Sequence, residues 1–451
     1  MNANAMTQQT EQAGYTLVVG LGKTGLSVVR HLRAHGERVV VADSRDIPPG
    51  LGALKQEFAD VECSTGSFDT ELFRKAARII ASPGVALSEP ALAAAIEKDV
   101  EVIGDIDLFA EYVSAPVVAI TGSNGKSTVT ELVTQMAKRA GIEAVACGNI
   151  GLPVLDALDE SVGLYVIELS SFQLETLRRL PMKAAVVLNV TADHLDRYDS
   201  MASYAQSKQR IYRNAETCVI NLDDTLAKDT GAVDCNCIGF TMGKPAEDTF
   251  GIENGHVCLA QQQLIAIGEI AIKGSHNIQN AMAALALGGS IGLPMGVMLE
   301  TLKDFQGLEH RMQFVASIGE VDWVNDSKAT NVGATIASLT GLAGKHVLIA
   351  GGIAKDADFS PLHDVVHEHC RAVVLLGRDA DRIAAAMPDD IHVERCDDMQ
   401  QAVVKASELA QAGDNVILAP ACASFDMFDN FEHRGEVFMQ AVTRLAAEVR
   451  A

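Results

Sequence analysis

Residues 117–128 read Val-Val-Ala-Ile-Thr-Gly-Ser-Asn-Gly-Lys-Ser-Thr, an apolar strand pattern that runs into a glycine loop and then a helix pattern. This order points backbone N–H groups and the positive end of a helix at an anion. Lys126 is placed to reach the outer phosphates of a nucleotide, and the hydroxyl of Ser127 or Thr128 to hold Mg²⁺. The loop is shorter than G-x-x-x-x-G-K-[ST], because position 120 is isoleucine. It therefore predicts a variant phosphate loop.

Apolar runs of this kind recur along the chain and alternate with helical patterns. Continuous apolar strands between amphipathic helices predict mainly parallel sheets covered on both faces, which is the α/β class. Besides Val117–Gly122, the runs are Thr16–Gly20, Val39–Asp43, Leu164–Glu168, Ala184–Asn189, His346–Ala350, Ala372–Leu376 and Asn415–Ala419.

A chain of 451 residues corresponds to about three domains. We place the boundaries near residues 104 and 309, which gives the domains 1–104, 105–309 and 310–451. The second domain includes a polar region, Leu226–Gln263, that we expect to form short strands. The third opens with a hairpin-like stretch, Gln313–Asn325.

The composition excludes some partners. With 36 basic and 59 acidic residues the formal charge is −23, so a long nucleic acid would be repelled. The uncharged stretch Ala281–Leu299 contains a Gly-Leu-Pro turn, so we interpret it as two buried helix segments and expect no membrane span. Nine scattered cysteines and a start without signal-peptide features predict reduced thiols in a cytoplasmic protein.

Acidic side chains follow two of the predicted strands. Glu168 ends one strand, and Asp193-His194 follow another. Ligands gather at the carboxyl ends of parallel strands, so we expect these residues to converge on the phosphate loop. Oxygen ligands in this position are typical of a magnesium site.

A second glycine loop, Gly20–Gly25, fits G-x-G-x-x-G and is followed by Asp43 at the end of the next strand. Taken alone, this pattern predicts an NAD-dependent oxidoreductase. It also fits a nucleotide-linked substrate, because any such loop grips a diphosphate. The loop Ser82-Pro83-Gly84 is placed to line the same crevice.

Two polar clusters mark the last third of the chain, Asn325–Asn331 and Ala419–Gly435, with Lys355 after a glycine turn between them. Lysines and hydroxyls on strand-end loops suit a small dicarboxylate.

The chain resembles the Mur ligases of peptidoglycan synthesis along its whole length. The resemblance rests on residues 121–128 and on the motifs Glu168–Leu174, Asn189–Arg197 and His276–Asn280. The clusters Asn325–Asn331 and Pro420–Gly435 are similar to the D-glutamate-adding members. The resemblance implies three domains: an N-terminal Rossmann-like domain, a central P-loop NTPase-like domain with a mostly parallel sheet, and a C-terminal Rossmann-like domain.

The resemblance also implies a reaction. ATP would phosphorylate the L-alanine carboxylate of UDP-N-acetylmuramoyl-L-alanine, and the amine of D-glutamate would attack the acyl phosphate to give an amide, ADP and phosphate. Such an enzyme would act as a monomer in cytoplasmic precursor synthesis.

The roles of individual residues follow from the resemblance only. The catalytic set would be Lys126, Asp193, His194 and Lys208, and two Mg²⁺ ions would bind to Ser127, Glu168, His194 and Lys208. An ammonium has no lone pair to offer a cation, so Lys208 would carry a carbamate.

Three substrate sites would complete the enzyme. ATP would be bound by Gly122, Asn124, Gly125, Lys126, Ser127, Thr128, Asn277, Asn280, Arg311 and Asp326. The UDP-linked substrate would be bound by Thr24, Asp43, Ser44, Arg45, Ser82, Asn149 and His194. Glutamate would be bound by Lys328, Thr330, Lys355, Ser424 and Phe431.

Three other functions stay open on the sequence. A nicotinamide-dependent oxidoreductase would explain Gly20–Gly25 but not Thr121–Thr128, Lys208 or Asn325–Asn331. An ATP-dependent switch protein would bind or hydrolyse ATP without forming an amide. A folylpolyglutamate synthase-like ligase would need a pterin site in place of the UDP site.

Overall fold

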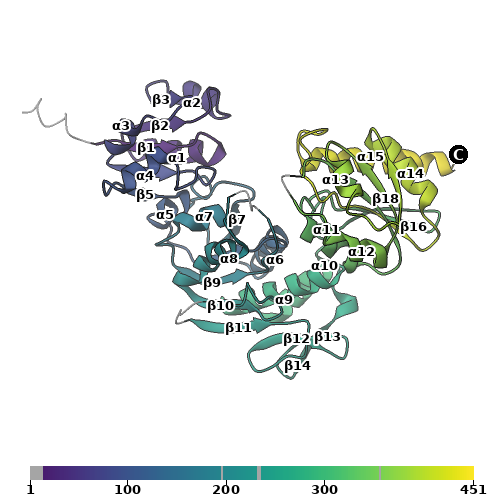
Figure 1. The fold of residues 1–451 in the computed structure, drawn as a ribbon. Coiled ribbons are helices and arrows are strands. Elements are labelled where there is room, and N and C mark those ends of the chain that lie inside the picture. Colours follow the sequence, from purple (N-terminus) through teal and green to yellow (C-terminus); the bar gives the residue numbers. More distant parts are fainter. Residues whose placement is uncertain (1–13, 194–196, 231–234, 355–356, 451) are drawn as a thin grey trace, which may run out of the picture.

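The computed structural model describes residues 14–193, 197–230, 235–354 and 357–450. They form three α/β domains, each built on one sheet. Figure 1 shows the central domain between the other two, which lie at opposite ends of a curved arrangement. This confirms the three-domain α/β fold that the alternating strands and helices predict.

The N-terminal sheet is entirely parallel, with the strand order β3-β2-β1-β4-β5. The order reverses at β1, so the loops after β1 and β4 open side by side at the carboxyl edge, where such sheets bind ligands. Its strands are β1 Thr16–Val19, β2 Val39–Asp43, β3 Glu62–Thr65, β4 Arg78–Ala81 and β5 Glu101–Ile103. Its helices are α1 Lys23–Ala34, α2 Leu51–Glu57, α3 Thr70–Arg74 and α4 Pro90–Ile96.

The central sheet has the order β14-β13-β12-β11-β10-β9-β6-β8-β7. The strands from β7 to β12 pair in parallel, and β12, β13 and β14 add an antiparallel edge. The strands are β6 Val117–Thr121, β7 Ala144–Gly148, β8 Leu164–Glu168, β9 Met182–Val187, β10 Ala215–Asn221, β11 Asn236–Phe240, β12 Thr249–Glu253, β13 His256–Leu259 and β14 Gln262–Ala266. The phosphate-loop strand β6 thus lies between β8 and β9.

Helices link and cover this sheet. Helix α5 connects the first domain to the second, and α9 and α10 come from the uncharged stretch that we interpreted as two helix segments. The bounds are α5 Asp105–Ala110, α6 Lys126–Arg139, α7 Ser171–Thr176, α8 Met201–Gln209, η1 Arg210–Asn214, η2 Ile267–Glu269, α9 Ser275–Ser290 and α10 Met295–Asp304. No helix in the described part of the chain combines the length and apolar character that a membrane span requires.

The C-terminal sheet has the order β15-β16-β20-β17-β18-β19 and is parallel except for the hairpin β15–β16. The strands are β15 Gln313–Ile318, β16 Val321–Asn325, β17 His346–Gly351, β18 Cys370–Leu376, β19 His392–Arg395 and β20 Asn415–Leu418. The helices are α11 Val332–Gly341, α12 Leu362–His369, α13 Ala380–Ala384, α14 Met399–Leu409 and α15 Phe431–Arg450. The predicted hairpin is confirmed.

The N-terminal and central domains share one apolar core. Buried side chains from both domains, among them Val18, Leu26, Val117 and Tyr165, belong to a single cluster. Phe109 of α5 lies inside it, with its ring edge-on to that of Tyr165 at a centroid distance of 5.2 Å. Burying one such ring contributes about 1.5–3 kcal/mol. The C-terminal domain has separate clusters on the two faces of its own sheet.

The prediction of reduced cysteines is wrong at one place. Cys218 of β10 and Cys235 form a disulfide, with a Cα–Cα distance of 6.1 Å. The two residues are 17 apart in sequence, but the parallel pairing of β10 with β11 brings the segment before β11 next to β10. Spacing alone does not reveal this proximity, because the register of the two strands creates it.

Candidate active site

The phosphate loop connects β6 to α6 and depends on Gly125. This residue has a φ of +83°, and a Cβ there would lie 2.4 Å from Oδ1 of Asn280. A side chain at this position would therefore clash and strain the backbone. The loop is held from below by Asn189, whose Oδ1 accepts a hydrogen bond from the Asn124 N–H at 2.8 Å and whose Nδ2 donates to the Asn124 carbonyl at 3.1 Å.

Glu168 lies at the carboxyl end of β8, next to the phosphate-loop strand, and its carboxylate is buried. Ser127 Oγ donates to one oxygen and Asn149 Nδ2 to the other, both at 2.7 Å. Arg311, which follows the central domain in sequence, donates from Nη2 to Ser127 Oγ at 2.7 Å. Two oxygen ligands of the kind that Mg²⁺ prefers therefore lie together, next to the amino end of α6.

Lys126 and Lys208 both point at the carbonyl of Gly122. Their Nζ atoms donate to it at 2.8 and 3.0 Å. Burial lowers the pKa of both side chains, for Lys208 well below its ordinary value, and the neighbouring Lys126 lowers the pKa of Lys208 further. Two buried lysine amines thus lie together at the phosphate loop.

Asp193 faces the C-terminal domain across the loop. Asn331 Nδ2 donates to Asp193 Oδ2 at 3.4 Å, while Asn331 Oδ1 caps α11 by accepting from the Ala334 N–H at 2.8 Å. Glu168 and Asp193 were predicted to converge on the phosphate loop. Both carboxylates lie close enough to Lys126 to raise its pKa, in opposition to the effect of burial. His194 lies outside the described residues.

A cavity of about 340 Å³ opens beside the phosphate loop, between the central and C-terminal domains. Burial raises the pKa of the Asp326 carboxyl, which accepts a hydrogen bond from Ser338 Oγ. The lining of this cavity includes seven of the ten residues predicted to bind ATP, namely Asn124, Gly125, Thr128, Asn277, Asn280, Arg311 and Asp326.

A larger cavity, of about 1120 Å³, lies between all three domains. It brings together residues from each of them, including Ser127 and Glu168 from the centre and Lys328 and Phe431 from the C-terminal domain. Six of the residues predicted to bind the UDP-linked substrate line it, namely Thr24, Asp43, Ser44, Arg45, Ser82 and Asn149.

Asp43 organises the first glycine loop. Its Oδ2 accepts from the Leu21 N–H at 2.7 Å and from Arg45 Nη2 at 2.6 Å, and its Oδ1 accepts from the Arg45 N–H at 2.9 Å and from Arg45 Nε at 2.8 Å. Burial opposes ionisation, but these hydrogen bonds outweigh it and lower the pKa of Asp43 to about 2. Both carboxylate oxygens are thus engaged by the protein, so Asp43 shapes the loop in addition to lining the cavity.

The residues predicted to bind glutamate divide into two groups. Lys328 and Phe431 line the large cavity, with Lys328 Nζ 3.9 Å from the centre of the Phe431 ring. Thr330 and Ser424 lie outside the lining of both cavities as the described residues define them. Lys355 lies outside the described residues.

The sequence did not single out Arg434, which is fully buried under this site. Its guanidinium donates to the Ser327 carbonyl at 2.8 Å and to the Cys422 carbonyl at 3.1 Å, which joins the two polar clusters of the last third. Lys273 and His276 also line the smaller cavity without having been predicted. The signal for His276 was its place in the motif His276–Asn280, and for Arg434 its place in a run of polar residues.

Family models match most of the chain. The model described as the N-terminal domain of MurD-like Mur ligases matches residues 14–104. The Mur ligase middle domain matches residues 120–288, and the Mur ligase glutamate ligase domain matches residues 310–422.

Curated relatives match over nearly the full length. The UDP-N-acetylmuramoylalanine--D-glutamate ligase of Nitrosococcus oceani is 48% identical over 444 residues, covering 97% of this chain and 98% of that protein. The protein of the same name from Pseudomonas aeruginosa is 49% identical over 440 residues, covering 96% and 98%. Among solved structures, a pseudomurein peptide ligase type C from Methanothermus fervidus has the same fold, with a TM-score of 0.61 at 18% identity over 96% of this chain and 100% of that one.

Proposed function

This chain belongs to the Mur ligase family, and from that membership we infer that it is an ATP-dependent ligase of peptidoglycan precursor synthesis, which adds D-glutamate to UDP-N-acetylmuramoyl-L-alanine. We assign the UDP-linked substrate to segment 1–104, ATP to 105–309 and glutamate to 310–451. The substrates and ATP are cytoplasmic metabolites, so we propose a cytoplasmic enzyme. All proposed site residues come from one chain, which supports a monomer as the functional unit.

One observation supports this function above the others. Arg311 and Lys328 line both the smaller and the larger cavity, so the two cavities meet at the phosphate loop. ATP in the smaller cavity would direct its terminal phosphate toward Lys126, and the UDP-linked substrate would approach the same point from the larger cavity. An oxidoreductase has no use for a phosphate loop at this junction.

The chemistry of the first step follows from this placement. A carboxylate oxygen of the L-alanine forms a bond to the γ-phosphorus, and the bond from that phosphorus to the β–γ bridging oxygen breaks to release ADP. Two anions have to approach each other, so positive charge at the junction is the main catalytic requirement. Lys126, Lys328 and Arg311 supply it.

In the second step the amine nitrogen of D-glutamate bonds to the acyl carbon, the amine loses a proton, and phosphate leaves as the C–O bond breaks. Lys328 and Phe431 in the large cavity support glutamate binding there, and we assign Thr330, Lys355 and Ser424 to the same site. We propose that Asp193 orients the amine, because it faces the C-terminal domain through Asn331.

The residues around Ser127 and Glu168 fit Mg²⁺. A hydroxyl and a buried carboxylate, hydrogen-bonded to each other, present hard oxygen ligands beside the loop. Ser127 and Glu168 would place Mg²⁺ where it would neutralise charge on the transferring phosphate. Ser127 and Glu168 would hold one ion, and His194 and a modified Lys208 a second.

Lys208 fits carbamylation. Carbon dioxide reacts with a neutral amine, and burial together with Lys126 lowers the pKa of Lys208 well below its ordinary value. The carbamate would turn a buried cation into an anion with two oxygen ligands. It would also place a negative charge beside Lys126, whose Nζ contacts the same Gly122 carbonyl.

The test is phosphate release from ATP and Mg²⁺ with UDP-N-acetylmuramoyl-L-alanine, in the presence of D-glutamate, L-glutamate or no amino acid. We expect release and a new amide product, identified by mass, with D-glutamate only. Release that is independent of the amino acid would support an ATP-dependent switch, and no release with either isomer would overturn the proposed ligase.

A further inference from the structure

Arg197 ends the motif Asn189–Arg197 and makes contacts that the proposed chemistry does not use. Its side chain is 16% exposed and forms an ion pair with Glu175 at 2.9 Å. Its guanidinium carbon lies 4.3 Å from the centre of the Phe172 ring, within the range of a cation–π interaction. Glu175 and Phe172 both belong to α7, the helix that follows Glu168.

The same guanidinium also reaches out of the central domain to the N-terminal domain. Nη1 donates to the Pro83 carbonyl at 3.2 Å, and Nη2 donates to the Val85 carbonyl at 3.4 Å. Pro83 and Val85 belong to the N-terminal domain and line the large cavity, together with Ser82 and Gly84. Arg197 itself is not part of that lining.

Among the described residues, the other hydrogen bonds that hold the loop 82–85 lie mainly at its base. Ser82 is anchored at the base, where its N–H donates to the Val19 carbonyl at 2.8 Å and its Oγ donates to the Gly20 carbonyl at 3.0 Å. The Val85 N–H then donates to the Ser82 carbonyl at 3.0 Å, which closes a turn. The carbonyls on either side of Gly84 are the ones that Arg197 holds.

Tyr198 keeps the arginine in place from the other side. Its hydroxyl donates to the second carboxylate oxygen of Glu175 at 2.7 Å, and its ring stacks on Phe172 at a centroid distance of 6.1 Å. Glu175 is thus bound by both Arg197 and Tyr198. The Glu175 carboxylate and the Phe172 ring together restrict the orientation of the planar guanidinium, from its edge and from its face. A guanidinium fixed in this way fixes the two carbonyls that it binds.

We propose that Arg197 is a positioning residue for the UDP-linked substrate, which holds the loop 82–85 of the N-terminal domain in register with the strand end that carries Glu168. This inference rests on the proposed function, because it assigns the large cavity to that substrate. It goes beyond it by giving the last residue of the motif a role in substrate affinity rather than in ATP binding or in the chemical steps.

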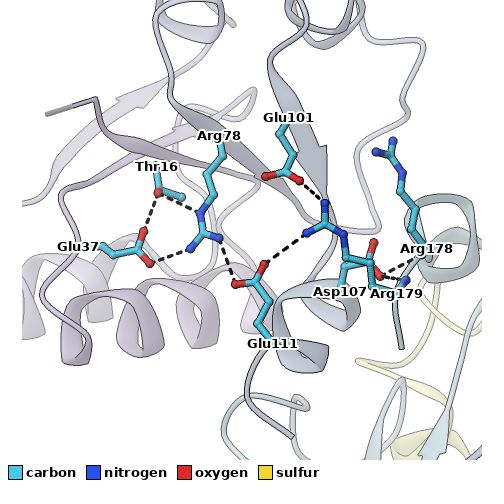
Figure 2. Close-up of polar contacts among 8 residues, drawn as sticks. All are labelled: Thr16, Glu37, Arg78, Glu101, Asp107, Glu111, Arg178 and Arg179. Atoms are coloured by element: carbon cyan, nitrogen blue, oxygen red, sulfur yellow. Dashed lines mark hydrogen bonds and ion pairs between the residues drawn. The ribbon is translucent and has the colours of Figure 1, made fainter. Parts of the chain in front are cut away.

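A second arginine of the central domain provides a matched control. Figure 2 shows Arg179 bridging to the N-terminal and linking segments through Glu101 and Glu111, while Glu111 also pairs with Arg78. Arg179 thus joins the same two domains as Arg197, but it contacts no residue of the loop 82–85 among the described residues, and its side chain is 51% exposed. Exposed ion pairs of this kind contribute little to stability.

The experiment measures the dissociation constant of UDP-N-acetylmuramoyl-L-alanine by titration calorimetry, and the KM values for all three substrates, in three variants. For Arg197→Met we expect the dissociation constant and KM of the UDP-linked substrate to rise about tenfold, because two hydrogen bonds from a charged donor are lost. The KM for ATP should change by less than about twofold. Arg197→Lys should give a smaller rise, since an ammonium can pair with Glu175 but cannot hold both carbonyls, and Arg179→Met should leave all values unchanged.

Titration needs no turnover, so this test is separate from that of the proposed ligase activity. An unchanged dissociation constant in a folded Arg197→Met variant would overturn the positioning role, even if the wild type forms the amide. Equal rises in all three KM values, or the same change in Arg179→Met, would show a general effect on domain contact and would also overturn it. Should Arg197→Met fail to fold, the Arg197→Lys variant decides by the same criteria.

Discussion

Lys208 is a residue whose role depends on its surroundings more than on its type. Its side chain is 2% exposed, its Nζ lies 4.5 Å from the centre of the Tyr204 ring, and its pKa is lowered by burial. An exposed helix lysine would remain an ammonium at neutral pH. Burial, and then the neighbouring Lys126, disfavour the charged form of the enclosed amine, and this favours its reaction with carbon dioxide.

Replacing Lys208 should show whether an anionic group is needed there. We expect Lys208→Ala to lose more than ~100-fold in kcat, because the proposed metal ligand is removed, and to regain activity with millimolar formate or acetate. Lys208→Met fills the same space, so it should be equally inactive and should not respond to these acids. Full activity of Lys208→Ala without added acid would contradict the carbamate.

We expect Lys328 to affect both the stability of the fold and the binding of glutamate. Burial, with help from Arg311 and Lys126, lowers the pKa of Lys328 to about 8 from 10.5. The folded protein therefore binds fewer protons than the unfolded chain between pH 8 and 10.5, so this lysine destabilises the fold below about pH 8 and the penalty declines as the pH rises toward 10.5.

From this sign we expect Lys328→Met to raise the melting temperature at pH 7 and to flatten its increase between about pH 8 and 10. The KM for D-glutamate should rise at least about tenfold, because the proposed partner of a glutamate carboxylate is lost. Melting curves across this pH range, measured beside the wild type, isolate the contribution of Lys328 from those of Lys126 and Lys208. If the melting temperatures of the two proteins change with pH in the same way, the lowered pKa of Lys328 does not affect stability as we expect.

At the scale of single elements, the phosphate loop and its helix allow a comparison of two glycines. Gly125 precedes α6 and Gly141 follows it, with φ values of +83° and +85°. A Cβ at Gly125 would collide with Asn280, whereas a Cβ at Gly141 would meet no atom within 4 Å. The backbone strain of an alanine is thus similar at both sites, while the steric cost differs.

We therefore expect Gly141→Ala to lower the free energy of unfolding by about 1 kcal/mol and to keep its activity. Gly125→Ala should lose at least ~100-fold in kcat/KM for ATP, because the loop has to shift away from Asn280. Steady-state kinetics at varied ATP and chemical denaturation of both variants check this. Equal kinetic effects in the two variants would mean that the loop geometry is not decisive.

The elements themselves were largely predictable from the sequence. The strands Val39–Asp43 and Leu164–Glu168 have the predicted bounds, and the segment Leu226–Gln263 contains the expected short strands. Apolar runs give these signals locally. The neighbours of β6 in the sheet were not predictable in this way, because β9 and β8 are brought to it by pairing across the domain.

The site was predictable where its residues lie at the carboxyl ends of neighbouring strands. Ser127 and Glu168 were expected to meet, since both follow strands of the same parallel sheet. The contacts of Arg311 with Ser127, of Arg434 with the Ser327 carbonyl and of Arg197 with the loop 82–85 depend on how domains and distant loops pack. Sequence periodicity carries no information on such contacts, and it equally missed the disulfide Cys218–Cys235.

At the scale of the whole molecule, the domains are joined unequally. The first two share one apolar core across α5, whereas the C-terminal domain has its own cores and meets the phosphate loop through polar contacts such as Arg311 to Ser127. Polar interdomain contacts of this kind exchange with water at little cost. We therefore expect the third domain, which Figure 1 shows at one end of the molecule, to move as a unit over the other two.

We predict that solution scattering will show a smaller radius of gyration when a non-hydrolysable ATP analogue and UDP-N-acetylmuramoyl-L-alanine bind together. Closure would bring charged side chains of the third domain onto the substrates and exclude water from the acyl phosphate. Arg311→Met should weaken this change, because the contact with Ser127 is lost. Identical profiles with and without both ligands would contradict closure.

The central claim is that one carboxylate oxygen of the UDP-linked substrate is phosphorylated before the amide forms. The most direct measurement uses UDP-N-acetylmuramoyl-L-alanine with ¹⁸O in the alanine carboxylate and follows the label into inorganic phosphate by mass spectrometry, with D-glutamate present. Our account predicts one labelled oxygen in phosphate for each amide formed, because the C–O bond breaks in the second step. Phosphate that carries no label while the amide accumulates would contradict it.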